Sequence, residues 1–338
     1  MPRQQRALVR CDLDVPLTQT VNEGTKIADT FRLDHALPTL ELLIKNNYTP
    51  VICGHMGRPK GVPSPELSTQ NLRPYFDLHL GVNNYELLEN LRFDPREEQN
   101  DLAYAEQLAF STNAHIYVNE SFATSHRAHA SMAAITKYLP SYAGLRLVKE
   151  VETLLSVIKN PARPLVSVIG GAKLESKGPA VSKFLEVSDT VLLGGRLGLE
   201  IEAKREDIIS NLVIPTDYAR AQKDIGPETT QTYSKILSQA KTVIWAGPLG
   251  VFEEDEFLKS TAQLAKLVTS NKNCYSLVGG GDSIAAMSKV GVLDKFSFVS
   301  TGGGAMLEFL IDESLPALES LEYTPTNGFP NTLVKLLE

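Results

Sequence analysis

The sequence predicts an α/β protein of two open domains, each built on a parallel sheet, joined by one long helix. In both halves of the 338-residue chain, short apolar runs alternate with stretches of helical periodicity. The runs are apolar throughout, which is typical of parallel strands covered by helices on both faces. Between the halves, residues 145–159 place Leu147, Val151 and Ile158 on one helical face, and Asn160-Pro161 ends the helix.

The first half is expected to contain strands and helices in alternation. The strands lie near Ala7–Arg10, Pro50–Cys53, Tyr85–Leu88 and Ile116–Val118. Asp29 is placed to cap a helix whose leucines recur at helical spacing, and further helices are expected at 101–110 and 131–139.

The second half repeats this pattern. Its predicted strands are Leu165–Ile169, Thr190–Leu193, Thr242–Trp245, Ser276–Val278 and Ser297–Val299. The tail, 323–338, begins rich in Pro, Asn and Thr and ends apolar, so it is expected to dock back on the body.

Composition excludes several classes of protein. With 43% hydrophobic and 22% charged residues and a net charge of −7, the chain is an ordinary globular protein without a basic nucleic-acid-binding domain. Its 3 cysteines are too few and too widely spaced for a zinc pattern or a disulfide framework, so a reduced cytoplasmic protein is expected. We see no signal peptide and no apolar run long enough to span a membrane.

Glycine clusters follow the strands of the second half, where open parallel sheets bind ligands. They are Gly170-Gly171, Gly194-Gly195, Gly279-Gly280-Gly281 and Gly302-Gly303-Gly304. Such loops let backbone N–H groups approach a phosphate. Tight turns are the alternative, but a turn needs only one glycine, so four clusters favour a nucleotide site. Neither GxxxxGK[ST] nor GxGxxG occurs, so the site is of another kind.

Two lysines and one carboxylate accompany these loops. Lys173 and Lys177 are four residues apart and would face the same anion from one side of a helix, or remain solvated at the surface. Asp282 directly follows three glycines, which suits Mg²⁺ held by one carboxylate and phosphate oxygens. Asp282 is also placed to cap the helix that follows.

Arginine and histidine instead follow the strands of the first half. In chain order the polar residues there are Arg10, Asp12, Arg32, His55, Arg58, Arg92, His126 and Arg127. Any one arginine alone would be a surface residue, but their recurrence at strand ends predicts a site for a ligand that carries phosphate and carboxylate. His129 would bind there too or would orient the turn in SHRAHAS.

Six motifs in order, GHMGRPKG, SHRAHAS, GGAKLESK, WAGPLGVFE, GGGDS and STGGGA, make the chain from Ala7 to Leu321 resemble the phosphoglycerate kinases. The resemblance implies two Rossmann-like domains joined by a long helix, with the C-terminal segment returning to the N-terminal domain. The expected boundaries are 1–144 for the triose-phosphate domain, 145–160 for the linking helix, 161–315 for the nucleotide domain and 316–338 for the returning segment.

The resemblance also implies the activity. This is Mg²⁺-dependent, reversible phosphoryl transfer between ATP and the carboxylate of 3-phosphoglycerate, which gives 1,3-bisphosphoglycerate and ADP in glycolysis and gluconeogenesis. A cytoplasmic monomer that closes about a hinge is expected, with small-molecule substrates and neither nucleic acid nor membrane as partner. The alternative is a non-catalytic nucleotide-binding relative used as a scaffold.

Carried over residue by residue, the resemblance implies three sets of site residues. Those for phosphoglycerate are Asp12, Asp14, Arg32, His55, Arg58, Arg92, His126 and Arg127. Those for the nucleotide are Gly171, Lys173, Lys177, Gly194, Gly195, Pro248, Val251, Glu253, Gly280, Gly281, Asp282 and Ser283, with Asp282 as the Mg²⁺ ligand. The catalytic set is Arg32, Lys173, Lys177, Gly302 and Gly303.

The chain departs from the family pattern in four places, one of which is Arg196 directly after the second glycine pair. Asp14 stands where the family has Asn, which adds a negative charge beside an anionic substrate. Ala246 replaces the Asn of W-N-G-P. The stretch from Gly195 to Asp224 is short and shows no recognisable helix after its glycine pair. The adenine side of the nucleotide site is therefore expected to differ from that of the family.

Overall fold

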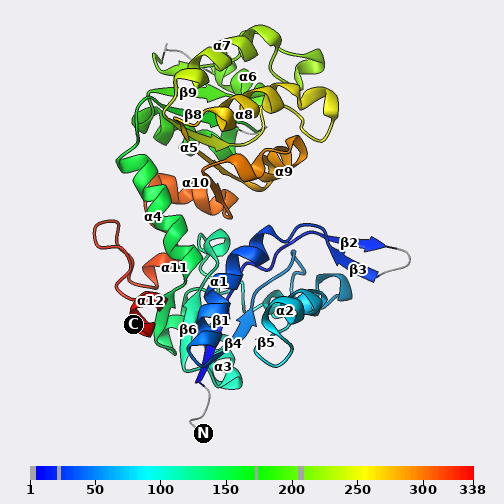
Figure 1. The fold of residues 1–338 in the computed structure, drawn as a ribbon, viewed down its shortest axis with the longest axis vertical. Helices are drawn as coiled ribbons and strands as arrows, with labels where there is room; N and C mark the ends of the chain where they lie inside the picture. Colours follow the sequence, from blue (N-terminus) through cyan, green and yellow to red (C-terminus); the bar gives the residue numbers. More distant parts are fainter. Residues whose placement is uncertain (1–4, 21–23, 172–173, 205–208) are drawn as a thin grey trace. The chain divides into compact units, whose positions relative to one another are not determined.

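The computed structural model describes residues 5–20, 24–171, 174–204 and 209–338. The chain forms two compact units, one of Met1–Glu152 with Ser314–Glu338 and the other of Thr153–Glu313 (Figure 1). We call them unit 1 and unit 2. Both are built on parallel sheets flanked by helices, which confirms the predicted α/β class.

Unit 1 contains a parallel sheet in the order β5-β4-β1-β6-β7. The strands are β1 (Gln5–Arg10), β4 (Tyr48–Cys53), β5 (Glu86–Leu87), β6 (Ile116–Asn119) and β7 (Ser141–Ala143). In chain order, β4 and then β5 are added on one side of β1. The chain then returns to the other side of β1, where it adds β6 and β7. Doubly wound sheets bind ligands at such a reversal, beyond the carboxyl ends of the two strands.

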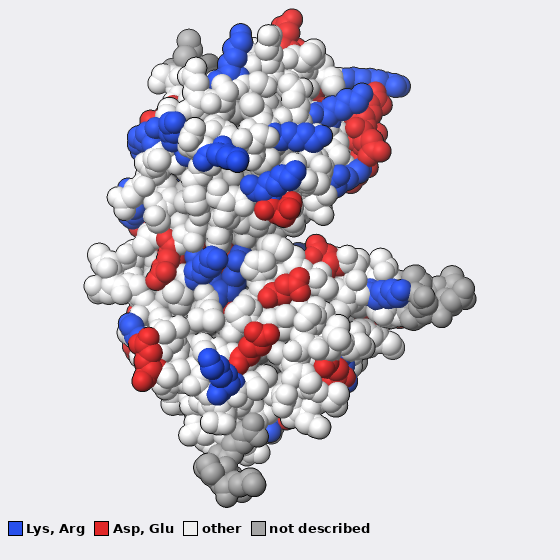
Figure 2. Space-filling model, in the orientation of Figure 1, with Lys and Arg blue, Asp and Glu red and all other residues white. Residues whose placement is uncertain are grey.

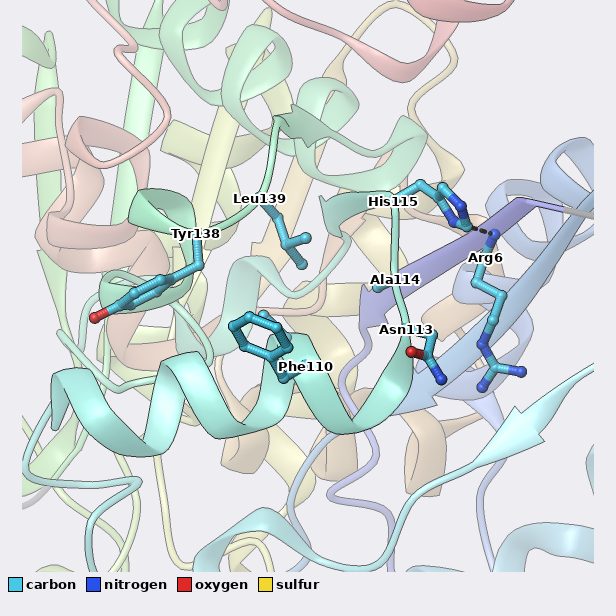
Figure 3. Close-up of a pocket in the computed structure, with 8 residues that line it drawn as sticks. Arg6, Phe110, Asn113, Ala114, His115, Tyr138 and Leu139 are labelled. Carbon is cyan, nitrogen blue, oxygen red and sulfur yellow. Dashed lines mark hydrogen bonds between the residues drawn. The ribbon is translucent and has the colours of Figure 1, made fainter.

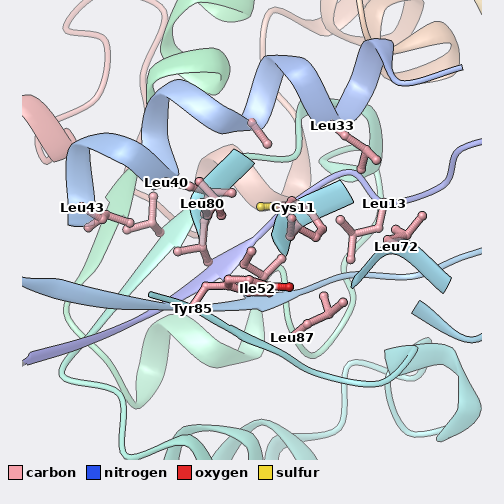
Figure 4. Packing of buried hydrophobic residues seen from close by; sticks show 14 of the residues in the cluster. Cys11, Leu13, Leu33, Leu40, Leu43, Ile52, Leu72, Leu80, Tyr85 and Leu87 are labelled. Carbon is pink, nitrogen blue, oxygen red and sulfur yellow. The ribbon is translucent and has the colours of Figure 1, made fainter. Parts of the chain in front are cut away.

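Helices and a hairpin surround this sheet. They are α1 (Phe31–Lys45), α2 (Arg73–Leu80), α3 (Leu102–Thr112), α11 (Pro316–Glu319), α12 (Leu333–Leu337) and the hairpin β2 (Leu17–Thr20)–β3 (Gly24–Ile27). Leucines of α1 at helical spacing pack with Cys11, Ile52 and Leu87 in a fully buried core (Figure 4). The C-terminal segment joins this core through Leu333, and Ala143 donates its backbone N–H to Asn331.

Some predicted elements of unit 1 were wrong. The helix expected at 131–139 is only a 3₁₀ turn, Ala134–Lys137; just before it, Ser131 N–H bonds to Glu97, and at its start Ala134 N–H bonds to Asn100. Asp29 is not the cap residue of α1. Thr30 holds that position, although the Asp29 carboxylate accepts the N–H of Phe31 at 2.7 Å.

Unit 2 contains a parallel sheet in the order β10-β9-β8-β11-β12-β13. The strands are β8 (Leu165–Ile169), β9 (Thr190–Leu193), β10 (Leu212–Val213), β11 (Thr242–Ala246), β12 (Tyr275–Gly279) and β13 (Phe298–Ser300). The helices are α5 (Leu174–Val187), α6 (Gly195–Lys204), α7 (Pro227–Gln239), α8 (Lys259–Ser270), α9 (Gly281–Val290) and α10 (Gly303–Asp312). The order reverses between β8 and β11, which places the expected ligand crevice beside these two strands.

Helix α6 overturns the expectation that no helix follows the second glycine pair. Two glycines lower its intrinsic helix propensity and hide it from sequence analysis. Packing compensates, because Leu197 is fully buried and a Cβ at Gly198 would lie 2.5 Å from the ring of Pro215. Gly198, which has no Cβ, thus lets α6 pack closely against Pro215.

Helix α4 (Leu145–Lys159) matches the predicted linking helix, and its residues are divided between the two units. Its first turn is held by the buried Glu120, which accepts the backbone N–H of Arg146 at 2.9 Å and the hydroxyl of Thr39 at 2.8 Å. The Thr39 hydroxyl in turn accepts the N–H of Leu145. Burial raises the pKa of Glu120 to about 8, although these donors oppose the rise.

We expect Glu120→Gln to stabilise unit 1 at high pH. The folded pKa of about 8 exceeds the unfolded value of about 4.3, so the contribution of Glu120 is complete below pH 4.3 and declines as pH rises through 8. Glutamine stays neutral, so the unfolding free energy of the variant should exceed the wild type's by about 5 kcal/mol at pH 9 and match it near pH 4. Urea unfolding at both pH values measures this, with exposed Glu152→Gln as control. A gap that does not change with pH would contradict the expectation.

None of the described helices is both long and apolar enough to cross a membrane.

Candidate active site

Eight predicted residues of unit 1 lie at one edge of its sheet. We call them the unit 1 site residues: Asp12, Asp14, Arg32, His55, Arg58, Arg92, His126 and Arg127. All except Arg32 follow the carboxyl ends of β1, β4, β5 or β6, and Arg32 lies in the first turn of α1. Because these strands are parallel, their loops meet beside the β1–β6 reversal.

Hydrogen bonds connect several of these residues directly. Arg32 Nη1 lies 3.2 Å from Asp12 Oδ1 and donates to the carbonyl of Asp14 at 2.9 Å. The Asp14 carboxylate accepts the N–H of Gly57 at 2.8 Å, and the carbonyl of Gly57 accepts from Arg92 at 2.9 Å. Burial raises the pKa of Asp12, and the charge of Arg32 opposes that rise. The loops after three strands therefore form one bonded network.

Positive charge in this network is only partly neutralised. Burial and the charge of Arg127 lower the pKa of Arg92, while Glu98, at 3.3 Å, acts in the opposite direction. Burial, followed by Arg127, lowers the pKa of His126. Unit 1 shows a compact group of Lys and Arg side chains on the face drawn in Figure 2. Neutral imidazoles among clustered guanidinium groups are suited to an anion with several oxygens.

His129 shapes a turn in the structure. Its carbonyl accepts the N–H groups of Met132 and Ala133, and its own N–H bonds to the carbonyl of Arg127 at 3.1 Å. Burial and neighbouring arginines lower its pKa to about 3, so the imidazole is neutral. The backbone of His129 therefore takes part in the SHRAHAS turn, whatever the role of its side chain.

A hollow of about 600 Å³ in unit 1 lies at the opposite, amino-terminal edge of the sheet from the unit 1 site residues (Figure 3). Arg6 near the start of β1 and His115 just before β6 line it with Phe110 and Tyr138. It contains none of the predicted site residues, so it is separate from the β1–β6 crevice.

Unit 2 has a cavity of about 620 Å³ beside its own strand reversal. Five predicted residues line it: Gly171, Pro248, Val251, Glu253 and Asp282. The loops after β8 and β11 approach closely here, since Gly247 has φ +107° and a Cβ on it would lie 2.3 Å from the carbonyl of Gly170. Only glycine fits this approach, which explains two of the glycines in the motifs.

Lys177 in α5 supplies positive charge near this cavity. Its side chain is partly buried, and burial lowers its pKa, while the nearby carboxylate of Asp282 acts in the opposite direction. Lys173, the second predicted lysine, lies outside the described residues.

The remaining predicted glycines build the walls of the site. Gly194 and Gly195 donate to the carbonyls of Ile169 and Leu249 at 2.8 and 3.0 Å, which braces the loops after β8 and β11. Gly280 and Gly302 cap α9 and α10, and a Cβ at Gly303 would lie 3.0 Å from the Gly280 Cα. Two helix N-termini therefore meet, which favours an anion.

Ser283 and Asp282 occupy different environments at the start of α9. Ser283 is buried, and its hydroxyl accepts the N–H of Gly247 at 2.7 Å, so it supports the loop after β11. Asp282 is exposed in the first turn of α9, and the cap position belongs to Gly280, which corrects the expectation that Asp282 caps this helix.

The sequence missed much of the cavity lining. The missed residues are Arg196, Leu199, Ala221, Gln222, Lys223, Leu249, Gly250 and Phe252. Ala221 and Gln222 have φ of +56° and +58°, an uncommon backbone conformation for residues other than glycine. Gly226-Pro227, just after this loop, predicts the start of α7. It does not predict the backbone conformation of the loop itself.

Comparison with known proteins gives a consistent answer. The sequence model of the family described as phosphoglycerate kinase matches residues 2–86, 78–222 and 197–313. A phosphoglycerate kinase of Leptospira biflexa is 36% identical over 388 aligned positions, which cover 94% of this chain and 95% of that protein. The cytosolic phosphoglycerate kinase 3 of Arabidopsis thaliana is also 36% identical, covering 93% and 94%.

Solved structures agree in fold. The phosphoglycerate kinase of Coxiella burnetii superposes with a TM-score of 0.80 at 31% identity, covering 94% of this chain and 96% of that one. The enzyme of Pyrococcus horikoshii gives 0.79 at 26% identity with the same coverage. The Leptospira alignment is longer than the 338 residues of this chain, so that relative carries residues that this chain lacks.

Proposed function

Because this chain belongs to the phosphoglycerate kinase family, we propose that its two strand-reversal sites bind 3-phosphoglycerate in unit 1 and ATP in unit 2. It is an enzyme of the kinase class, and the scaffold alternative is not favoured, because relatives with this activity match nearly the whole chain. The reaction is reversible transfer of a phosphoryl group between ATP and the carboxylate of 3-phosphoglycerate.

The observation that carries the unit 1 assignment is the bonded network of Asp12, Asp14, Arg32 and Arg92. Guanidinium groups bind phosphate and carboxylate oxygens in pairs, and 3-phosphoglycerate carries both groups. His55, Arg58, His126 and Arg127 complete the proposed site from neighbouring loops. Arg32 also faces the transferred phosphoryl group.

The unit 2 assignment rests on the 620 Å³ cavity at the β8–β11 reversal. The helix N-termini at Gly280 and Gly302, together with Lys177 and Lys173, neutralise the nucleotide phosphates in this proposal. Pro248, Val251 and Glu253 line the adenosine end. Ala246, buried in β11, has no side-chain amide with which to contact the nucleotide.

Magnesium fits this site as an ion carried by the nucleotide. Among the residues described, no cluster of three or more His, Cys, Asp or Glu side chains could hold a metal by itself. Asp282 alone reaches the cavity from α9 with an exposed carboxylate, which suits Mg²⁺ completed by phosphate oxygens and water. Such an ion would supply charge neutralisation to the phosphates.

The proposed chemistry needs no general base. The acyl phosphate is already activated, so the chain has to position two anionic substrates and offset their repulsion. Arg32 and Lys177 stabilise the charge that develops on the transferred group. Water must be excluded from the acyl phosphate, because it would otherwise hydrolyse.

Calorimetry tests the two binding assignments separately. Titration with 3-phosphoglycerate should give one site that Arg92→Ala weakens while Asp282→Asn does not. Titration with ATP and Mg²⁺ should show the opposite dependence. Loss of both ligands in one variant of preserved fold would contradict the assignment of one ligand to each unit.

Asp14 makes a specific prediction for substrate affinity. Its carboxylate would lie beside the anionic substrate, and its side chain is 42% exposed. Asp14→Asn keeps an acceptor for the N–H of Gly57 and removes the charge, so the KM for 3-phosphoglycerate should fall about fivefold, as about 1 kcal/mol of relieved repulsion implies. Steady-state kinetics measure this, and the KM for ATP serves as control. An unchanged or higher KM for 3-phosphoglycerate would contradict the prediction.

We also propose that the enzyme acts as a monomer in the cytoplasm, as the resemblance implies. Light scattering of the purified chain checks the oligomeric state, and a mass of twice 37.0 kDa would contradict it.

A further inference from the structure

Arg10 ends β1 and is fully buried, and it belongs to none of the three sets of site residues that the resemblance implies. Its Nε donates to the hydroxyl of Ser131 at 3.1 Å, and its Nη1 donates to the carbonyl of Cys11. Its Nη2 lies 2.8 Å from Nδ1 of His55, which is also buried. Each guanidinium nitrogen therefore has a defined partner.

The contact with His55 determines where the imidazole carries its proton. A guanidinium group only donates hydrogen bonds, so Nδ1 of His55 must accept. A neutral imidazole accepts through its unprotonated nitrogen, which places the hydrogen on Nε2. The opposite tautomer and the imidazolium would both set two donors against each other at 2.8 Å.

We propose that Arg10 is a positioning residue that holds His55 in one neutral tautomer, so that its Nε2–H is offered as a donor to the anionic substrate. The proposal rests on the assignment of His55 to the phosphoglycerate site. Nε2 lies 4.0 Å from the Asp14 carboxylate and therefore faces the side of the imidazole where the unit 1 site residues gather.

A second layer of contacts holds Arg10 itself. The Ser131 hydroxyl donates to one oxygen of Glu97 at 2.6 Å, and the Ser131 N–H donates to the other at 3.0 Å. With its hydrogen committed to Glu97, the hydroxyl oxygen is oriented to accept from Arg10. Glu97 is fully buried, and its carboxylate balances the positive charge of Arg10 through Ser131, which lies between the two side chains.

The charges around His55 favour the same state. Burial is the largest effect on the pKa of His55, and nearby positive charges act in the same direction. This pKa therefore lies well below its usual range. The guanidinium groups that act on it in this direction are those of Arg10, Arg92 and Arg32, whereas the neighbouring imidazole of His129 is neutral. The carboxylate of Asp14 acts in the opposite direction from 4.0 Å.

The neutral Nε2–H of His55 is a suitable hydrogen-bond donor for an anion whose negative charge is already balanced by arginines. Binding then requires no proton uptake at His55, so this imidazole should add no step of its own to the pH dependence of substrate affinity near 6.5, where a free histidine titrates. Arg10 would thus act on affinity through His55 without touching the substrate.

Nitrogen-detected NMR of the ¹⁵N-histidine-labelled protein tests the proposal without any turnover. The wild-type His55 ring should show the pattern of a neutral imidazole with Nε2 protonated from pH 5.5 to 8. Arg10→Met should allow both tautomers and give a ring that titrates within this range. The KM of that variant for 3-phosphoglycerate should rise about tenfold, as loss of one well-placed donor implies, with a smaller change in kcat.

Two further variants separate positioning from folding. Arg10→Lys retains a charge and a donor and should restore part of the KM and of the Nε2–H signal. Arg6→Met changes the arginine at the other end of the same strand, where it pairs with Glu86, and should leave both readings unchanged. An Nδ1-protonated or doubly protonated His55 in the wild type overturns the proposal whether or not Arg10→Met folds. Failure of turnover with the expected NMR pattern would contradict the proposed function alone.

Discussion

Arg32→Ala is expected to lower kcat/KM for 3-phosphoglycerate about 1,000-fold. Arg32 is the guanidinium that connects Asp12 and Asp14 at the start of α1, and we propose that it also meets the phosphoryl group in transfer. Removing one donor from a developing negative charge typically costs a factor of 100 to 1,000. Steady-state kinetics in the direction of ATP consumption measure the loss.

Arg32→Lys provides the matched control for this prediction. It keeps the charge but loses the planar pair of donors, so its kcat/KM should fall between those of the wild type and the alanine variant. ATP affinity should be unchanged in both variants, because Arg32 belongs to unit 1. An alanine variant that retains wild-type kcat/KM would remove Arg32 from the transfer step.

Lys177→Met is expected to lower kcat about 100-fold while leaving the unfolding free energy of unit 2 equal or higher. The ammonium group is proposed to neutralise phosphate charge that grows in the transition state. In the absence of substrate its burial is unfavourable, as its lowered pKa indicates. A residue that serves catalysis at a cost in stability is expected to behave in this way.

Lys183→Met on the same helix is the control for Lys177→Met. Lys183 lies 3.9 Å from Glu313, outside the residues that line the cavity, so its loss should leave kcat unchanged. Thermal unfolding of both variants supplies the stability comparison. A large fall in the melting temperature of Lys177→Met would mean that the lysine is structural and would contradict the prediction.

Local sequence patterns predicted the linking helix and the strands of both sheets except the short edge strands β7 and β10. Continuous apolar runs such as Leu165–Ile169 can only be buried strands or short buried helices, and the glycines after them decide for strands. Helix α4 has a strong apolar stripe and a clear stop at Asn160-Pro161. Each of these signals lies within a single strand or helix and the residues next to it, so the sequence alone is sufficient to predict these elements.

Elements stabilised by distant contacts were not predictable. Helix α6 exists because Gly198 packs on Pro215, and the loop at Ala221 takes its conformation from contacts such as that of Lys223 with Val251. The hydroxyl of Ser283, the predicted phosphate ligand, also accepts the N–H of Gly247, a contact between distant parts of the chain that no local pattern shows. Likewise, no local pattern shows that Arg10 reaches His55, 45 residues away along the chain.

A coupled assay of the purified chain with 3-phosphoglycerate, ATP and Mg²⁺, repeated with GTP, tests most directly whether the chain transfers a phosphoryl group from the nucleotide to 3-phosphoglycerate. We expect turnover that requires all three components and falls about 1,000-fold in Arg32→Ala. A folded protein that binds both substrates but gives no turnover with either nucleotide would contradict it.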